Sequence, residues 1–281
     1  MKKSFQKARR RREDGLPFKH DLGQHFLYDK ALLQSLVAST GVSKEDSVLE
    51  IGPGSGMLTA CLCEAAGQVL AVEVDESLLP LLNASLAPYR NVTVKHGDIR
   101  RLPLPELCAP LGQGFFVIAN IPYNVTTPIL DLLLDSGLPI AQISLMVQKE
   151  VADKLLARPS EEAYGPLSVK AQYRGDPSLA CIVPAEVFTP PPKVDSAFVN
   201  IPLRQSPPLP VADEKLLFAL VKAGFGQRRK TLVNALKIIL PLEGDVVRDI
   251  LQSLNLSPTI RGEALDVADW IRFANACQKR L

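Results

Sequence analysis

Asn120-Ile121-Pro122-Tyr123 is the stretch whose residue types most directly suggest chemistry. The exocyclic amine of adenine is a poor nucleophile, because its lone pair is delocalised into the ring. The carbonyls of the Asn120 side chain and the Pro122 main chain can accept both amine N–H bonds and favour a pyramidal nitrogen. The Tyr123 ring offers a face on which a base can stack. Such a site acts by positioning and electrostatics and predicts group transfer to an exposed adenine amine, although the tetrad also occurs by chance.

A glycine-rich turn, Gly52-Pro53-Gly54-Ser55-Gly56, follows the apolar run 48–51 and precedes a helical pattern. Glycines there allow positive φ angles and a close approach of a ligand. The third glycine of a dinucleotide fingerprint is replaced by Met57, and no Lys-Ser/Thr pair follows as in a P-loop. Glu50 before the turn and Glu73 after the next apolar run favour S-adenosylmethionine, which has a ribose and an adenine but no phosphate. An ordinary tight turn with a solvated Glu73 is the alternative.

Strand and helix patterns alternate through the first half of the chain. Apolar runs predict strands at 48–51, 69–72, 91–98, 115–119 and 143–147, with helices at 76–86, 126–136 and 149–157. This alternation predicts a doubly wound parallel sheet. Ligands bind at the carboxyl ends of such strands, where the sequence places Gly52, Glu73, Asp98 and Asn120. We expect Asp98 to bind the adenine amine of the cofactor.

The second half of the chain begins with a proline-rich region. Eight of the 23 prolines lie between Pro184 and Pro210. Short strands at 179–183 and 197–203 predict an antiparallel end to the sheet, and 207–210 predicts a linker. Only helical patterns follow, at 214–224, 231–240, 245–254 and 264–277. We therefore expect a basic arm at 1–20, a methyltransferase domain at 21–206 and a small all-α domain at 207–281.

The composition is that of an ordinary globular protein, with 281 residues, a net charge of +2 and 47% hydrophobic residues. Seven of the first twelve residues are Lys or Arg, which predicts either phosphate contact or a solvated tail. The five cysteines and three histidines show no metal-binding spacing and predict reduced thiols in the cytoplasm, with no metal site. No apolar run approaches the ~20 residues of a membrane span, and no apolar segment follows the basic amino terminus as in a secretory signal.

Motifs along nearly the whole chain resemble those of the ribosomal-RNA adenine N6-dimethyltransferase family, particularly its bacterial small-subunit (16S) branch. The resemblance implies a Rossmann-like class I methyltransferase fold and S-adenosylmethionine as cofactor. The matching stretches are 23–27, 50–56, 73–75, 97–98, 120–124, 148–152, 164–169, 188–196 and 225–230.

The resemblance also implies roles for individual residues. Cofactor contacts are expected at His25, Leu27, Gly52, Glu73, Asp98 and Asn120, and the glycine turn adds Gly54. His25 departs from the Asn that is usual in the family, but an imidazole can still donate a hydrogen bond to the methionine carboxylate or ribose. Phe188 is expected near the target base, opposite Tyr123. The cations Arg228, Arg229 and Lys230 form a basic corner of the helical domain and are expected to bind RNA.

The activity that the resemblance implies is transfer of methyl groups to N6 of two adjacent adenosines in the 3′-terminal hairpin loop of 16S rRNA. The expected partner is an immature 30S subunit, and the protein is expected to be a monomer. One alternative is an assembly factor that acts mainly by binding, as the basic arm and corner suggest. Another is a large-subunit rRNA methyltransferase that confers antibiotic resistance. A nicotinamide oxidoreductase is disfavoured by Met57.

Overall fold

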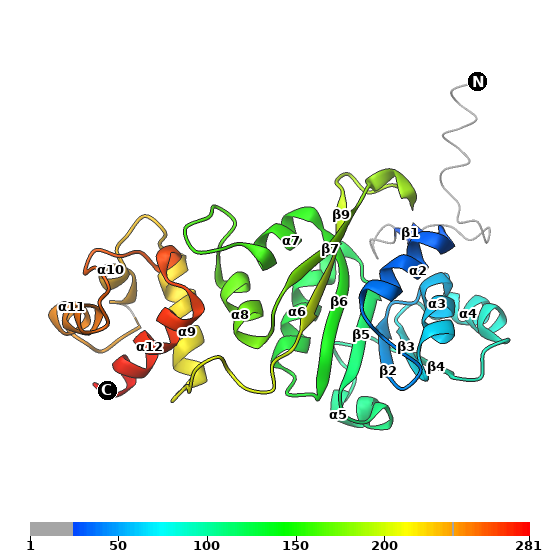
Figure 1. Ribbon diagram of the computed structural model, residues 1–281, viewed down its shortest axis with the longest axis horizontal. Helices are drawn as coiled ribbons and strands as arrows, with labels where there is room; N and C mark the ends of the chain where they lie inside the picture. Colours follow the sequence, from blue (N-terminus) through cyan, green and yellow to red (C-terminus); the bar gives the residue numbers. More distant parts are fainter. Residues whose placement is uncertain (1–24, 238) are drawn as a thin grey trace, which may run out of the picture. The chain divides into compact units, whose positions relative to one another are not determined.

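Seven strands form one sheet in the order β4-β3-β2-β5-β6-β9-β7 in the computed structural model, which describes residues 25–237 and 239–281 (Figure 1). Strands β2 to β6 pair in parallel, whereas β9 runs antiparallel to both β6 and β7. The predicted doubly wound sheet with an antiparallel end is therefore confirmed. The strands are β2 (Ser47–Ile51), β3 (Gln68–Glu73), β4 (Val92–His96), β5 (Phe115–Asn120), β6 (Ile140–Gln148), β7 (Ser178–Val183) and β9 (Ser196–Pro202). The expected arm at 1–20 lies outside the described residues.

Strand β2 lies at the centre of this arrangement. Its neighbours are β3 on one side and β5 on the other, so the strand order reverses there and creates the switch point at which open α/β sheets bind ligands. Consecutive residues Val48 and Leu49 are both fully buried, which shows that both faces of β2 are covered. One cover consists of α2 and α3, whose Leu36 and Leu62 pack in the same core cluster as Val48.

Short helices connect the strands and place the strand ends at one edge. They are α2 (Lys30–Ser39), α3 (Met57–Ala65), α4 (Leu79–Leu86), α5 (Leu104–Cys108), α6 (Thr126–Asp135) and α7 (Lys149–Leu156). Helix α2 begins at the N-cap Asp29, whose carboxylate accepts a hydrogen bond from the Leu32 amide. In the described part of the chain, no helix combines the length and the apolar character that a membrane crossing requires.

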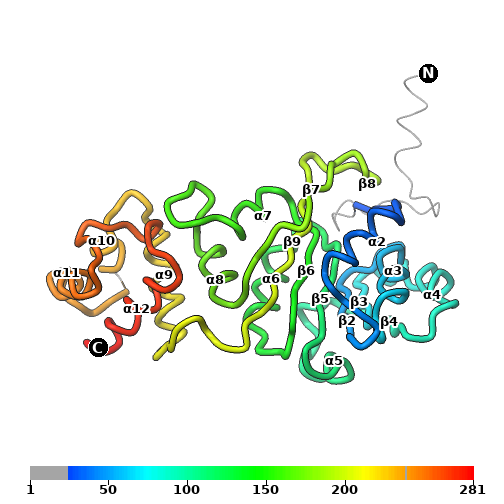
Figure 2. Tube along the Cα trace, viewed as in Figure 1, coloured from blue at the N-terminus to red at the C-terminus, as the bar shows by residue number. Residues whose placement is uncertain are grey.

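A second, two-stranded ribbon joins residues that lie far apart in the sequence. Strand β1 (Phe26–Leu27) pairs antiparallel with β8 (Phe188–Thr189), so that the tube returns beside its own amino-terminal part (Figure 2). Leu27 and Phe188 are opposite each other and are both buried. The sequence pattern did not predict this ribbon, because two residues are too few to show an alternation.

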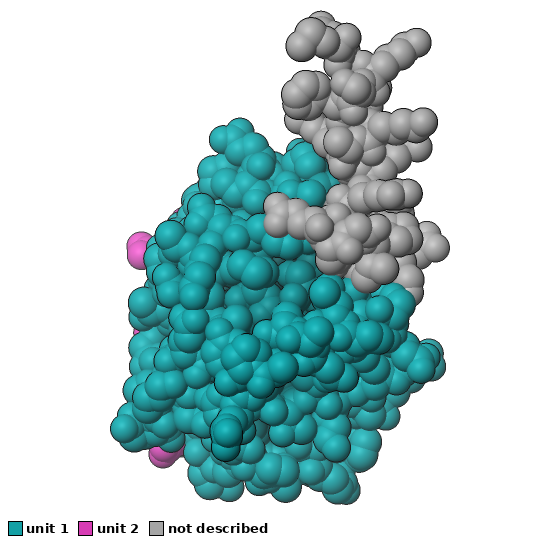
Figure 3. All heavy atoms as spheres, turned by 90° about the vertical axis from the view of Figure 1, so that its right-hand side faces the viewer, with its two compact units in different colours: residues 1–152, 178–203 teal, residues 153–177, 204–281 magenta. Residues whose placement is uncertain are grey.

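The chain divides into two compact units, coloured separately in Figure 3. The second unit contains Asp153–Pro177 and Arg204–Leu281 and is helical. The segment Arg204–Leu281 begins close to the predicted boundary between residues 206 and 207. The segment Asp153–Pro177 also belongs to this unit, although the sequence pattern places it in the sheet domain. The reason is that Tyr164 and Tyr173 bury their rings in the helical core.

The second unit is built around one hydrophobic core. Trp270 and Phe273 are fully buried there, among apolar residues of every helix of the unit. Helix α8 was not predicted. The helices are α8 (Pro166–Arg174), α9 (Glu214–Gly226), α10 (Leu232–Leu236), α11 (Gly244–Ser253) and α12 (Val267–Gln278).

Candidate functional site

A cavity of about 1070 Å³, including its open mouth, lies in the first unit at the carboxyl ends of the central strands. The structure brings eight of the predicted residues together around it: His25, Leu27, Gly52, Gly54, Glu73, Asp98, Asn120 and Pro122. They come from β1 and the residue before it, from the ends of β3 and β5, from the loop after β4 and from the turns that follow β2 and β5. Tyr123 and Phe188 do not line it.

The glycine turn forms one wall of the cavity. Gly52, Gly54 and Gly56 have φ angles of +72°, +58° and +83°, which L side chains rarely adopt. A Cβ at Gly54 would lie 2.7 Å from Cε1 of Phe26, so the turn also packs too tightly for a side chain. The Gly54 amide points at Glu73 and donates to its Oε2 over 3.0 Å.

Two buried acids lie beside this turn. Glu73 accepts hydrogen bonds from the amides of Gly54 and Asp75, at 3.0 and 2.8 Å, yet burial still raises the pKa of its carboxyl. Glu50 is 1% exposed, and its Oε2 has no hydrogen-bond partner among the described residues. The pKa of Glu50 is raised to about 8, mainly by burial and to a smaller extent by the nearby charge of Glu73. The cavity therefore has an acidic, poorly solvated wall.

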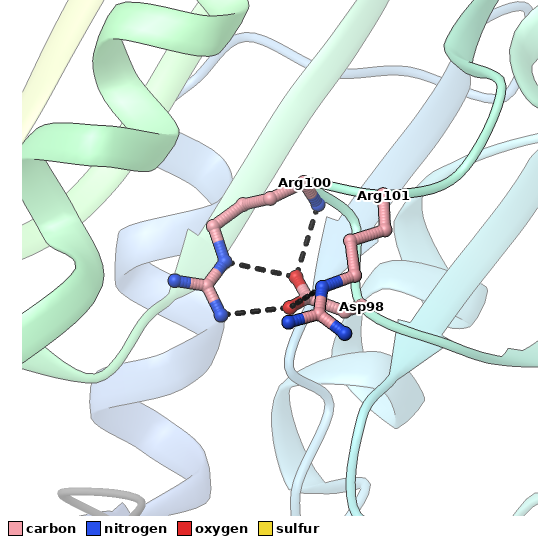
Figure 4. A network of polar contacts seen from close by, with 3 residues as sticks. All are labelled: Asp98, Arg100 and Arg101. Carbon is pink, nitrogen blue, oxygen red and sulfur yellow. Dashed lines mark hydrogen bonds and ion pairs between the residues drawn. The ribbon is translucent and has the colours of Figure 1, made fainter.

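Asp98, the predicted partner of the cofactor's adenine, forms a two-point ion pair with Arg100 (Figure 4). Arg100 Nε lies 2.9 Å from Oδ1 and Nη2 lies 2.7 Å from Oδ2, and the Arg100 amide also donates to Oδ1. These hydrogen bonds lower the pKa of the Asp98 carboxyl. Arg100 also lines the cavity and was not predicted, since nothing in the spacing distinguishes it from Arg101.

Asn120 ends β5 with its amide held in one orientation. Its Nδ2 donates to the main-chain oxygen of His25 over 3.1 Å, which leaves Oδ1 as the acceptor end. The Pro122 carbonyl accepts hydrogen bonds from the Val125 amide at 3.1 Å and from Thr126 Oγ1 at 3.3 Å. The Pro122 oxygen, which is predicted to bind the target amine, therefore already accepts hydrogen bonds within the turn that starts α6.

The Tyr123 ring is held from two sides. It stacks on the His25 ring, with 5.4 Å between centroids and 24° between planes, and its hydroxyl is hydrogen-bonded to Ser196 Oγ. Burial raises the pKa of the Tyr123 hydroxyl. Phe188 is only 2% exposed and belongs to a core cluster, so its ring does not face an open stacking site in this conformation.

The predicted basic corner lies in the second unit, at the end of α9. Arg228 forms an ion pair with Glu263 at 3.0 Å and donates to the Glu162 carbonyl. Arg229 and Lys230 are exposed. Arg228 is exposed as well, but these two contacts give it a structural role.

The cavity residues fit the predicted S-adenosylmethionine. This molecule carries an ammonium and a sulfonium, and a buried carboxyl with an unpartnered oxygen on the cavity wall suits a cationic ligand. Of the described residues that line the cavity, none is a Lys, and the turn has no phosphate-binding Lys-Ser/Thr pair. Glu73 on β3 has the position at which nucleotide folds bind a ribose.

Comparisons with known proteins find related sequences over most of the chain. The model of a family described as ribosomal RNA adenine dimethylase matches residues 15–278. A protein of Ligilactobacillus salivarius named ribosomal RNA small subunit methyltransferase A is 45% identical over 271 residues, which cover 94% of this chain and 92% of that protein.

Two solved structures share the fold. A dimethyladenosine transferase from Plasmodium falciparum superposes with a TM-score of 0.80 at 24% identity, covering 91% of this chain and 98% of that one. The 23S rRNA methyltransferase ErmE gives a TM-score of 0.71 at 24% identity, covering 90% and 99%.

Proposed function

Because the chain belongs to the ribosomal RNA adenine dimethylase family, we propose that it methylates N6 of two adjacent adenosines in the 3′-terminal hairpin loop of 16S rRNA. The methyl donor is S-adenosylmethionine. The small-subunit name of the relative that is 45% identical supports this choice of RNA. The main structural support for the proposal is that Asn120 lines the acidic cavity and that the Tyr123 ring stacks on His25, another residue of the cavity wall.

The cavity residues hold the cofactor, which when bound supplies an electrophilic methyl group on a sulfonium. Glu73 accepts hydrogen bonds from the ribose hydroxyls, and Asp98 accepts one from the adenine amine. Gly52 and Gly54 leave room for the ligand at the turn, and Leu27 contributes an apolar wall. Burial keeps a proton on the Glu50 carboxyl near neutral pH, and the positive charge of the bound ligand would favour its ionised form.

The tetrad residues hold the target base. Asn120 Oδ1 accepts an N–H of the amine, because the other end of this amide is bound to His25. The Pro122 carbonyl accepts the second N–H if the base displaces the long contact from Thr126. Tyr123 stacks on the base through the face opposite His25. A role for Phe188 next to the base requires its ring to leave the core.

We propose the immature 30S subunit as the partner, bound in part by Arg229 and Lys230 in the helical unit. The methyl-transfer site belongs to the domain predicted at 21–206 and the basic corner to that at 207–281. The protein acts as a monomer in the cytoplasm, a setting that its five free thiols support.

The alternatives have less support. The family description and the name of the 45% identical relative favour methylation of small-subunit rRNA over binding alone. The likeness to the 23S enzyme is at 24% identity and concerns the fold, so it does not favour a large-subunit substrate.

The test is methyl transfer by Asn120→Ala. Loss of the side-chain acceptor for the amine should lower tritium incorporation from labelled S-adenosylmethionine into immature subunits by ~10²- to 10³-fold, as for other preorganised polar groups. Asn83→Ala, an exposed position on α4, is the matched control and should leave the rate unchanged. Primer extension on the product should locate two adjacent modified adenosines. Equal incorporation by Asn120→Ala would disprove this mechanism.

A further inference from the structure

His25 contacts the target side of the site through both its side chain and its main chain. Its Nδ1 lies 2.7 Å from the Pro190 carbonyl, just beyond β8, and therefore carries a hydrogen and donates it. Its ring stacks on Tyr123, and its main-chain oxygen accepts the Asn120 amide hydrogen bond. One residue thus connects the β1–β8 ribbon to two of the four residues that receive the base.

The stacking geometry limits where a base can bind. His25 covers one face of the Tyr123 ring, and Ser196, which is fully buried at the start of β9, holds the hydroxyl. A ring fixed in this way can accept a second aromatic group only on its other face. Stacked aromatic pairs are most favourable when both rings are already oriented, since no rotamer entropy is lost on binding.

Among the described residues, the His25 side chain contacts Pro190 and Tyr123 and not the acids of the cavity. Its hydrogen-bond partner is Pro190 and its ring partner is Tyr123, although the residue as a whole lines the cavity. The family resemblance implies a contact to the methyl donor at this position, made by an Asn. An Asn has no ring to place on Tyr123, so the two residue types are not equivalent here.

We propose that His25 is a positioning residue for the target adenine: its ring supports Tyr123 as the stacking surface for the flipped-out base. This inference rests on the proposed function and deepens it, because it assigns the His25 side chain to the RNA base rather than to the methyl donor. Loss of the ring removes one of the two supports of Tyr123 and weakens base stacking, while Glu73 in the cavity keeps its hydrogen bonds to the main chain.

Three substitutions separate the possible roles of His25. His25→Phe keeps a ring and loses the Nδ1 donor, His25→Asn introduces the usual residue of the family, and His25→Ala removes both features. Thermal midpoints first establish that each variant is folded. S-adenosylhomocysteine affinity is then measured by calorimetry. Base stacking is measured without any methyl donor, by the fluorescence quenching of 2-aminopurine placed at the target position of the hairpin RNA.

We expect the S-adenosylhomocysteine dissociation constant to change less than about twofold in all three variants. The 2-aminopurine quenching and kcat should both fall about tenfold in His25→Ala and His25→Asn, and His25→Phe should retain most of both. A tenfold loss of S-adenosylhomocysteine affinity with unchanged quenching would instead make His25 a cofactor contact and overturn the inference. Equal quenching by His25→Phe and His25→Ala would also overturn it. If the wild-type protein itself transferred no methyl group, the proposed function would fail, independently of these results.

Discussion

At the scale of single residues, the Glu50 carboxyl is the group whose charge the fold most strongly influences. It is buried, one of its oxygens has no partner among the described residues, and burial raises its pKa to about 8. Below pH 4.5 the folded and unfolded chains both carry its proton. Between this value and about 8 the unfolded chain ionises while the folded chain keeps the proton, so folding stability falls as the pH rises.

The free energy of unfolding should therefore decrease by a few kcal/mol between pH 5 and 8 because of this residue, and level off above that. Urea unfolding across this range measures the slope, and Glu50→Gln should make it clearly shallower. Part of the slope should remain in the variant, since burial also raises the pKa of Glu73. An unchanged slope in Glu50→Gln would show that the carboxyl ionises without cost in the folded protein.

The hydrogen bond between Tyr123 and Ser196 gives a second residue-scale prediction. Tyr123→Phe and Ser196→Ala each remove one partner, so each should lower kcat by roughly threefold to tenfold, which corresponds to ~1 kcal/mol. The double variant should lose no more than either single variant, because the interaction is lost only once. Steady-state rates of the wild-type protein, the two single variants and the double variant on the hairpin RNA give this double-mutant cycle. Multiplicative losses would mean that the two residues act independently.

At the scale of elements, the glycine turn between β2 and α3 combines positive φ angles with tight packing. Gly54→Ala places an L side chain at a positive φ and a Cβ 2.7 Å from Cε1 of Phe26, so we expect a loss of ~2–4 kcal/mol of stability and weaker cofactor binding. Gly41→Ala is the matched control, since its φ is +76° and nothing lies within 4 Å of the new Cβ. It should cost only ~1–2 kcal/mol. Denaturant unfolding of both variants tests whether packing adds to the strain.

The elements also show how far the sequence could predict this site. The strands that end at or just before Gly52, Glu73 and Asn120 are apolar runs, so hydrophobicity indicates the strands, and their alternation with helices indicates a common edge for their carboxyl ends. The β1–β8 ribbon is different, because its two strands lie more than 150 residues apart in the sequence and pair over only two residues. Contacts that depend on it, such as His25 with Tyr123, leave no local signal. The Asp98–Arg100 ion pair depends on rotamers that no spacing specifies.

At the scale of the whole molecule, the charge is nearly balanced at +2, so RNA affinity must come from local groups rather than from a general field. The proposed division of work assigns the cofactor to the first unit and part of the RNA contact to the second. Arg228 is exposed but contacts Glu263 and the Glu162 carbonyl, so the test of RNA binding is made on Arg229 and Lys230.

Replacing both Arg229 and Lys230 by Ala should weaken binding of the immature subunit and leave the S-adenosylhomocysteine affinity unchanged. If each cation neutralises one phosphate, the slope of log K against log salt should become shallower by ~0.7–0.9 per residue, because fewer counterions are released. The exposed pair Lys215 and Lys222 on α9 provides the control, since the same two charges are removed elsewhere on the helical unit. Binding measured at several salt concentrations distinguishes the variants. An equal change of slope in both double variants would indicate a diffuse field instead of a defined phosphate contact at the corner.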